Sequence, residues 1–317
     1  MSAEDDAPPP EESWRWSLWS PKDRVWQKAT QELWNSLEAV EERKSPIIPL
    51  KIHQIWLGGG SPPEECKKSM ATWRNLHPSW EYHLWLDADA ERELSDVCPW
   101  LLEGFLQATN LAEKSDLLRL AVVLRHGGLY VDVDFDCLRP FDCLHHKFAF
   151  YTGESNVGAF ELNNGLFAAC PGHPAVRFLC DHVGRPWPEW GGDDVDQREA
   201  VAFQLAKSVA LSNFGISELM APQRNPTQCL ETTGPGFFTR GLAVAILRPF
   251  CAGGDGSLAG NEDGTRAVIC PRSYFYPLQN KARKLPREER LAKALPESFA
   301  LHHWCRTWMK DEDLVSG

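Results

Sequence analysis

The stretch SDLLRLAVVLRHGGLYVDVDFD, residues 115–136, decides the fold of this chain. Its first half has the three- and four-residue spacing of an amphipathic helix, with one apolar stripe formed by Leu117, Leu120, Ala121 and Leu124. Ser115 and Asp116 suit the first turn of that helix, where the dipole favours an acid. Gly127 and Gly128 then predict the end of the helix and a sharp turn.

The second half of the stretch changes to a period of two. Apolar Leu129, Val131, Val133 and Phe135 alternate with Tyr130, Asp132, Asp134 and Asp136. This pattern predicts one strand that projects its three carboxylates onto one side.

Carboxylates at every second position repel one another unless a cation or solvent compensates them. One interpretation is a solvated strand end that runs into a loop. The other is a divalent metal site, since hard oxygen ligands select Mg²⁺ or Mn²⁺ and substrate phosphates often complete the shell of such an ion.

Helix, Gly-Gly, apolar strand and paired aspartates, in that order, resemble the central motif of glycosyltransferase family 32. The segment is also similar to that of the large clostridial glucosylating toxins. The resemblance implies an α/β fold of the GT-A nucleotide-sugar transferase type, with a mostly parallel, Rossmann-like central sheet flanked by helices. It also implies a metal cofactor, Mn²⁺ or Mg²⁺, and a UDP- or GDP-sugar as donor.

The resemblance spans roughly residues 47–308. IIPLKIHQIWLGGG, residues 47–60, resembles the opening strand of the family. By that resemblance Trp56 stacks on the nucleobase and the backbone near Leu57 and Gly58 reads its edge; core packing is the alternative for Trp56. A helix over residues 64–76 and a strand over residues 81–86 follow, and their alternation predicts ligands beyond the carboxyl ends of parallel strands.

Residue by residue, the resemblance places Asp116 and Arg119 at the donor sugar and diphosphate, although their spacing also permits a simple helix ion pair. Asp132 is expected at the ribose or sugar and at the metal, and Asp134 as the principal metal ligand. Tyr130 is expected to pack under the site, with Asp136 as an outer acid.

Two later segments extend the expected site. Asn164, in ELNNGLFAACPGHP, matches a family position expected to bind sugar hydroxyls, and a capping role for this Asn is the alternative. ALHHWCRTW, residues 300–308, resembles the closing His-x-Trp element of the family. There His302 is expected to complete the metal shell or to contact the diphosphate, and His303 is the weaker candidate.

The catalytic set is therefore Asp132, Asp134, Arg119 and Asn164. The acids Asp193, Asp194 and Asp196 are interpreted as helix caps or acceptor-loop residues rather than nucleophiles.

Composition limits the function classes. The chain has 317 residues and a formal charge of −11, which argues against nucleic acid as a partner. The 14 Trp are expected mostly in the core, and the ten Cys permit disulfides without requiring them.

We expect an acidic, Pro-rich disordered tail over residues 1–19, an amphipathic helix within residues 20–45, a catalytic domain over residues 46–310 and a short tail over residues 311–317. The sequence contains neither a signal peptide nor an integral membrane segment. A cytoplasmic location is therefore expected, or the Golgi lumen if a membrane anchor has been removed.

The predicted function is a metal-dependent, retaining transfer of a hexose or N-acetylhexosamine from the donor to a hydroxyl of a glycan, lipid or protein. The main alternative is a non-catalytic protein of the same fold that binds nucleotide sugars or serves as a scaffold. Metal-dependent phosphoester hydrolysis would need further ligand clusters, which the sequence does not offer.

Overall fold

The computed structural model describes residues 24–38, 40–108, 110–157, 160–184, 232–247 and 266–305. The helices in these ranges are α1 (Arg24–Glu38), α2 (Glu64–Leu76), α3 (Asp87–Val97), α4 (Pro99–Gln107), α5 (Leu111–His126), α6 (Asp142–Lys147), α7 (Pro174–His182), α11 (Pro235–Leu242), the π-helical η5 (Ala243–Leu247), α13 (Arg272–Phe275), the 3₁₀ η7 (Asn280–Lys284) and α14 (Arg287–Ala292). The strands are β1 (Lys51–Ile55), β2 (Glu81–Trp85), β3 (Gly128–Val131), β4 (Phe135–Cys137), β5 (Phe150–Glu154), β6 (Leu162–Ala169), β7 (Ala267–Cys270) and β8 (Ala300–His302).

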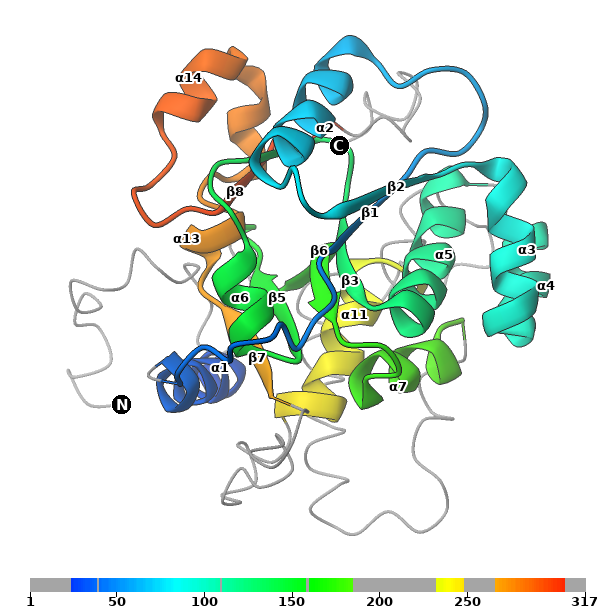
Figure 1. Cartoon of the computed structure of the whole chain (residues 1–317), viewed down its shortest axis with the longest axis horizontal. Coiled ribbons are helices and arrows are strands. Elements are labelled where there is room, and N and C mark those ends of the chain that lie inside the picture. Colours follow the sequence, from blue (N-terminus) through cyan, green and yellow to red (C-terminus); the bar gives the residue numbers. More distant parts are fainter. Residues whose placement is uncertain are drawn as a thin grey trace, which may run out of the picture.

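A six-stranded sheet in the order β2-β1-β3-β6-β5-β7 forms the centre of the molecule. The pairs β1–β2, β1–β3 and β5–β7 are parallel, whereas β6 runs antiparallel to both β3 and β5. Helices surround the sheet, with α5 against β1, β3 and β6, α11 against β6, and α1 against β7 (Figure 1). The predicted α/β class with a mostly parallel sheet flanked by helices is therefore confirmed.

Strand direction determines which segments meet. Strands β1, β2, β3, β5 and β7 all end at one edge of the sheet, and antiparallel β6 begins there. We call this the carboxyl edge. The segments that leave it start at Trp56, Leu86, Asp132, Ser155 and Pro271, and the segment that leads into β6 ends at Glu161. Ligands of open α/β sheets bind beyond such an edge.

Helix α5 begins earlier than predicted. Asn110 is its N-cap and accepts a hydrogen bond from the Ala112 backbone N–H at 2.8 Å. Asp116 therefore lies in the second turn and not at the dipole end, because an Asn upstream caps the helix. The predicted stop is confirmed: Gly127 has φ 60°, and a β-carbon there would lie 2.6 Å from Cδ of Pro171.

The prediction of one continuous strand over residues 129–136 is wrong. Strand β3 ends at Val131, and a turn closed by the Phe135 N–H to the Asp132 carbonyl (3.3 Å) precedes β4. Strand β4 then pairs with β8 in a separate two-stranded sheet. The alternation of apolar and acidic residues mimics a strand, but the turn separates the acids, which face different partners.

The flanking predictions agree with the structure. The predicted helix over residues 64–76 is α2, and the predicted strand over residues 81–86 is β2. The five tryptophans 26, 34, 73, 80 and 85 are buried, which supports the expected packing role. The expected tails over residues 1–19 and 311–317 lie outside the described residues, and the predicted domain boundaries stay predictions.

None of the described helices combines the length and the apolar character needed to cross a lipid bilayer.

Candidate metal and donor-binding site

Three predicted metal ligands meet at the carboxyl edge. Asp132, Asp134 and His302 each offer one ligand atom, and these atoms lie within 4.8 Å of one another. Asp132 directly follows β3, whereas His302 ends β8, about 170 residues away in sequence. The pairing of β4 with β8 sets Phe135 opposite His302, and this register brings the imidazole beside Asp134.

The segment after β8 wraps around Asp134. His302 Nε2 lies 3.2 Å from Asp134 Oδ1, and the backbone N–H of Cys305 donates to Oδ2 at 2.8 Å. The backbone N–H of His303 donates to the Asp134 carbonyl at 3.0 Å. Against the opposing effect of burial, His302 and the Cys305 N–H lower the pKa of Asp134 to about 2. Asp134 is therefore ionised at neutral pH and suited to binding a cation.

Asp132 has a more open environment, with 29% of its side chain exposed. Its Oδ1 accepts a hydrogen bond from the Tyr130 hydroxyl at 2.6 Å and lies 3.4 Å from Arg119 NH2. Burial raises the pKa of Asp132; the Arg119 guanidinium opposes this shift, and the Asp134 carboxylate adds to it. Tyr130 packs beneath this carboxylate, as expected.

Arg119 organises the inner side of the site. Its NH2 lies 3.1 Å from Asp116 Oδ1, its NH1 donates to the Asn164 carbonyl at 2.8 Å, and its Nε donates to the Ser115 carbonyl at 3.3 Å. The guanidinium also stacks over the Tyr130 ring at 4.6 Å. Arg119 thus forms the ion pair with Asp116 on its own helix and also lies beside Asp132. The predicted contact of Arg119 with the diphosphate stays a prediction.

Asn164 donates to Asp116 Oδ1 at 2.8 Å from within β6, so the capping alternative is wrong. Thr233 Oγ1 donates to Asp116 Oδ2, also at 2.8 Å. Burial raises the pKa of Asp116 to about 6, although the nearby Arg119 guanidinium acts to lower it. Thr233 is thus a further residue of the site, and the sequence did not single it out.

Gly165 allows this close packing. A β-carbon on it would lie 2.7 Å from Asp132 Oδ2 and 2.9 Å from Asn163 Oδ1. The Gly165 carbonyl accepts the Asp132 backbone N–H at 2.8 Å. Asp132 and the start of β6 therefore fit together only because residue 165 has no side chain.

The segment predicted to bind the nucleobase follows β1 at the same edge. Trp56 is partly buried and packs against the cluster of Cys66, Met70 and Val133, the residue between the two aspartates. Leu57 is buried, and the Gly58 N–H donates to the exposed Asp87 carboxylate at 3.0 Å. These contacts place the segment beside the metal ligands, and the predicted nucleobase contacts of Trp56, Leu57 and Gly58 stay predictions.

Asp136 and His303 belong to a neighbouring cluster. His303 Nε2 lies 3.0 Å from Asp136 Oδ2, and Arg287 pairs with Oδ1. The Arg287 guanidinium also donates to Ser69 Oγ at 3.0 Å. Asp136 is thus an outer acid, as expected, and it connects β4 to α14 and α2.

Gln54 and Tyr82 form a chain of hydrogen bonds that supports the backbone of Asp132. Gln54 Nε2 donates to the Asp132 carbonyl at 3.3 Å, and its Oε1 accepts from the Tyr82 hydroxyl at 2.6 Å. His53 donates to the Gly127 carbonyl through Nε2 at 2.9 Å and accepts from Trp85 Nε1 at 3.2 Å. His53 and Gln54 are therefore buried polar groups whose side chains are hydrogen-bonded within the protein.

Two carboxylates and one imidazole form a donor set that can hold a divalent metal ion, and the expected Mn²⁺ or Mg²⁺ stays a prediction. Asp193, Asp194 and Asp196 lie outside the described residues.

Comparison with known proteins finds a family model that matches part of the chain. Residues 63–151 match the family model described as "Glycosyltransferase sugar-binding region containing DXD motif". This range includes Asp132, Val133 and Asp134, so the predicted resemblance to glycosyltransferases with a DXD motif is confirmed.

The curated relatives are more specific. "Inositol phosphoceramide mannosyltransferase 2" of Schizosaccharomyces pombe is 31% identical over 138 residues, 44% of this chain and 39% of the relative. "Mannosyl phosphorylinositol ceramide synthase SUR1" of Saccharomyces cerevisiae is 31% identical over 148 residues, 45% of this chain and 37% of the relative. The chain therefore spans about two fifths of the length of these relatives.

Among solved structures, "PaToxG Glycosyltransferase" aligns with 74% of this chain and 88% of its own, at 16% identity and a TM-score of 0.41.

Proposed function

We propose that this chain is a glycosyltransferase that binds a nucleotide-diphosphate sugar at Asp132, Asp134 and His302 and transfers the sugar to an acceptor hydroxyl. The observation that carries the proposal is that one ligand atom from each of these three side chains lies within 4.8 Å of the other two at the carboxyl edge. Asp132 and Asp134 belong to the matched DXD region, and His302 comes to it from the end of β8. A divalent cation held there would supply positive charge beside the leaving diphosphate.

The chain's own residues would prepare the reaction. Asp134 stays ionised because of His302 and the Cys305 N–H, and Arg119 holds Asp132 and Asn164 in fixed positions. Such fixed charges favour the transition state because they need no reorganisation when charge develops.

The proposed chemistry retains the anomeric configuration. The bond between sugar C1 and the β-phosphate oxygen breaks, the acceptor oxygen forms a bond to C1 on the same face, and the acceptor proton passes to the departing diphosphate. This route needs no carboxylate nucleophile. Analysis of the product anomer tests it, and an inverted product would exclude it.

The names of the curated relatives favour a mannosyl donor and an acceptor that contains inositol phosphate. A glycan or a protein hydroxyl is the alternative acceptor. The two expected locations, cytoplasm and Golgi lumen, stay predictions.

Isothermal titration of UDP-glucose, UDP-galactose, UDP-N-acetylglucosamine and GDP-mannose, each with Mn²⁺ or EDTA, tests donor binding. We expect one donor to bind only with Mn²⁺, and Asp134→Ala to abolish that binding. The control is Asp96→Ala, which removes an acid whose side chain is 54% exposed on α3. Folded wild-type protein that binds none of the four donors would contradict the proposal. Binding without transfer to any acceptor would instead support a non-catalytic nucleotide-sugar-binding protein.

A further inference from the structure

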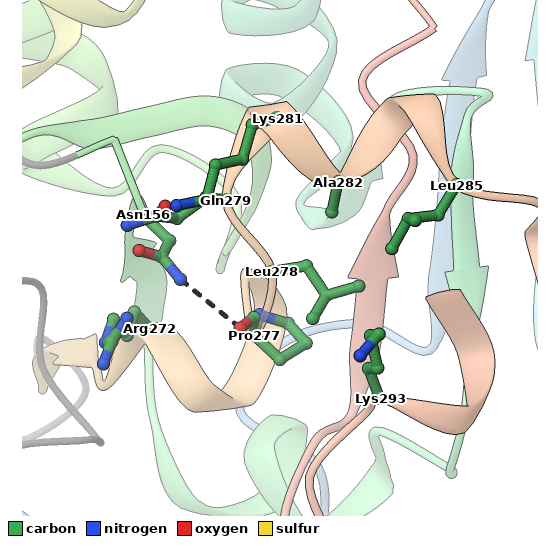
Figure 2. Close-up of a pocket in the computed structure, with 9 residues that line it drawn as sticks. All are labelled: Asn156, Arg272, Pro277, Leu278, Gln279, Lys281, Ala282, Leu285 and Lys293. Atoms are coloured by element: carbon green, nitrogen blue, oxygen red, sulfur yellow. Dashed lines mark hydrogen bonds between the residues drawn. The ribbon is translucent and has the colours of Figure 1, made fainter. Parts of the chain in front are cut away.

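A pocket lies farther along the carboxyl edge than the metal site. Its volume is about 430 Å³, and its lining comes from Asn156, Arg272, Pro277, Leu278, Gln279, Lys281, Ala282, Leu285 and Lys293 (Figure 2). Asn156 follows β5 and Arg272 follows β7, just as Asp132 follows β3. Adjacent strands lie about 4.8 Å apart, so the end of β5, two strands from β3, is roughly 10 Å from the DXD turn.

A shared wall connects this pocket to the metal site. Pro277 and Leu278 directly follow Tyr276, whose hydroxyl donates to the Asn163 carbonyl at 3.4 Å. Trp304 Nε1 donates to the Leu278 carbonyl at 3.4 Å, and the Trp304 ring lies 4.1 Å from that of His302. A molecule in the pocket would therefore lie next to the proposed donor site.

The pocket is cationic in an acidic protein. Arg272, Lys281 and Lys293 line it, and none of its lining residues in the described part of the chain is an acid. Residues 272–293 contain seven Lys or Arg and two Glu, although the chain as a whole has 33 basic and 44 acidic residues. Within the described residues, no ion pair joins Lys281 or Lys293 to an acid. These charges favour an anionic ligand.

The pocket also offers a neutral polar group. Asn156 is 3% exposed, and its Nδ2 donates to the Pro277 carbonyl at 3.3 Å (Figure 2). Its Oδ1 accepts no hydrogen bond from the described residues. An acceptor of this kind suits a ligand hydroxyl.

We infer that this pocket binds the phosphate of a hydroxylated acceptor, with Lys281, Lys293 and Arg272 on the phosphate and Asn156 toward the hydroxyls. The inference rests on the proposed transferase function and assigns the acceptor subsite. The phosphate belongs either to a free polyol phosphate or to a lipid headgroup, since both present the same chemistry.

The first test is titration of the full chain with myo-inositol 1-phosphate, with Mn²⁺ and a nucleoside diphosphate already bound. We expect binding that weakens about tenfold in Lys281→Gln/Lys293→Gln, because both charge-assisted contacts are lost. Lys28→Gln/Lys284→Gln removes two exposed charges outside the pocket and is expected to bind like the wild type. Uncharged myo-inositol is expected to bind far more weakly than its phosphate.

Unchanged inositol phosphate affinity in Lys281→Gln/Lys293→Gln would overturn the inference. The inference would also be overturned if Lys281→Gln/Lys293→Gln lost nucleoside diphosphate binding and kept inositol phosphate binding, because the pocket would then bind the donor. Absence of donor binding together with retained inositol phosphate binding would instead contradict the proposed function alone.

Sedimentation with vesicles separates the two sources. We expect binding to phosphatidylcholine vesicles that contain phosphatidylinositol if the ligand is a lipid headgroup, and binding of the soluble phosphate alone if it is not. Equal binding to vesicles that contain phosphatidylserine or phosphatidylinositol, without binding of soluble myo-inositol 1-phosphate, would overturn the inference. The pocket would then be part of a charged surface that faces a membrane.

Discussion

The backbone N–H of Cys305 donates a hydrogen bond to the carboxylate of Asp134 across 2.8 Å. The chain reaches this position because Trp304 adopts φ 57°, a left-handed conformation that is unfavourable for a residue with a side chain. The backbone hydrogen bonds of His303 and Cys305 to Asp134 hold the end of the described chain against the DXD turn despite this strain, and the Cys305 bond stabilises the ionised form of Asp134.

The two acids that follow Val133 are expected to differ in function. Asp134→Asn should weaken Mn²⁺ binding at least about tenfold, because a charged ligand of the cluster is lost. Asp136→Asn should leave Mn²⁺ affinity nearly unchanged and lower the free energy of unfolding by about 1–3 kcal/mol, because Arg287 and His303 lose a buried partner. Calorimetric Mn²⁺ titration and urea denaturation measure the two effects. Equal loss of Mn²⁺ affinity in both variants would contradict this separation.

Gly165→Ala should damage the site through packing. The new methyl group would lie 2.7 Å from Asp132 Oδ2, so Asp132 or β6 must shift. We expect the free energy of unfolding to fall by about 1–3 kcal/mol and Mn²⁺ binding to weaken. Gly104→Ala in α4 is the matched control, because its methyl group would lie 3.6 Å from the nearest atom and alanine favours a helix. Wild-type Mn²⁺ affinity in Gly165→Ala would show that Asp132 tolerates the shift.

Arg119→Lys preserves the charge but not the contacts. One ammonium group cannot contact Asp116, Asp132 and the Asn164 carbonyl in the geometry of a guanidinium. We expect a loss of roughly 2 kcal/mol in the free energy of unfolding and a lower kcat, as Asp132 and Asn164 lose their fixed positions. Arg125→Lys on the same helix, where the side chain is 44% exposed, should cost less than about 1 kcal/mol. Similar effects of the two changes would argue against a positioning role for Arg119.

Acid should destabilise the protein through His53. Burial lowers the pKa of His53 to about 4, partly offset by its hydrogen bond to the Gly127 carbonyl, whereas the unfolded chain has a value near 6.5. The unfolded state binds the proton more readily, so stability is full above pH ~6.5 and is lost as pH falls toward ~4. Between pH 7 and pH 5 this residue should account for about 2 kcal/mol of lost stability.

Urea denaturation at the two pH values measures that loss. His53→Gln should be less stable than the wild type at pH 7 and should show a pH dependence that is about 2 kcal/mol smaller. The same pH dependence in both proteins would exclude His53 as the source.

The sequence alone determined the fold class, the helix and strand that flank Gly127 and Gly128, and the identities of Asp132, Asp134 and His302 as a candidate metal site. The helix and the strand follow from local periodicity and from the conformational freedom of glycine, and the carboxylates of Asp132 and Asp134 indicate a metal by their chemistry. The fold type and the choice of His302 came instead from the resemblance of residues 47–60, 115–136 and 300–308 to a known family.

Only the tertiary structure decided which acids act together. The break after Val131 and the pairing of β4 with β8 place Asp134 beside His302 and Asp136 beside Arg287, although the sequence spaces all three acids equally. The antiparallel direction of β6 likewise brings Asn164 and Gly165 to the same edge as Asp132. Contacts of this kind depend on strand order and register between distant segments, which no local pattern specifies.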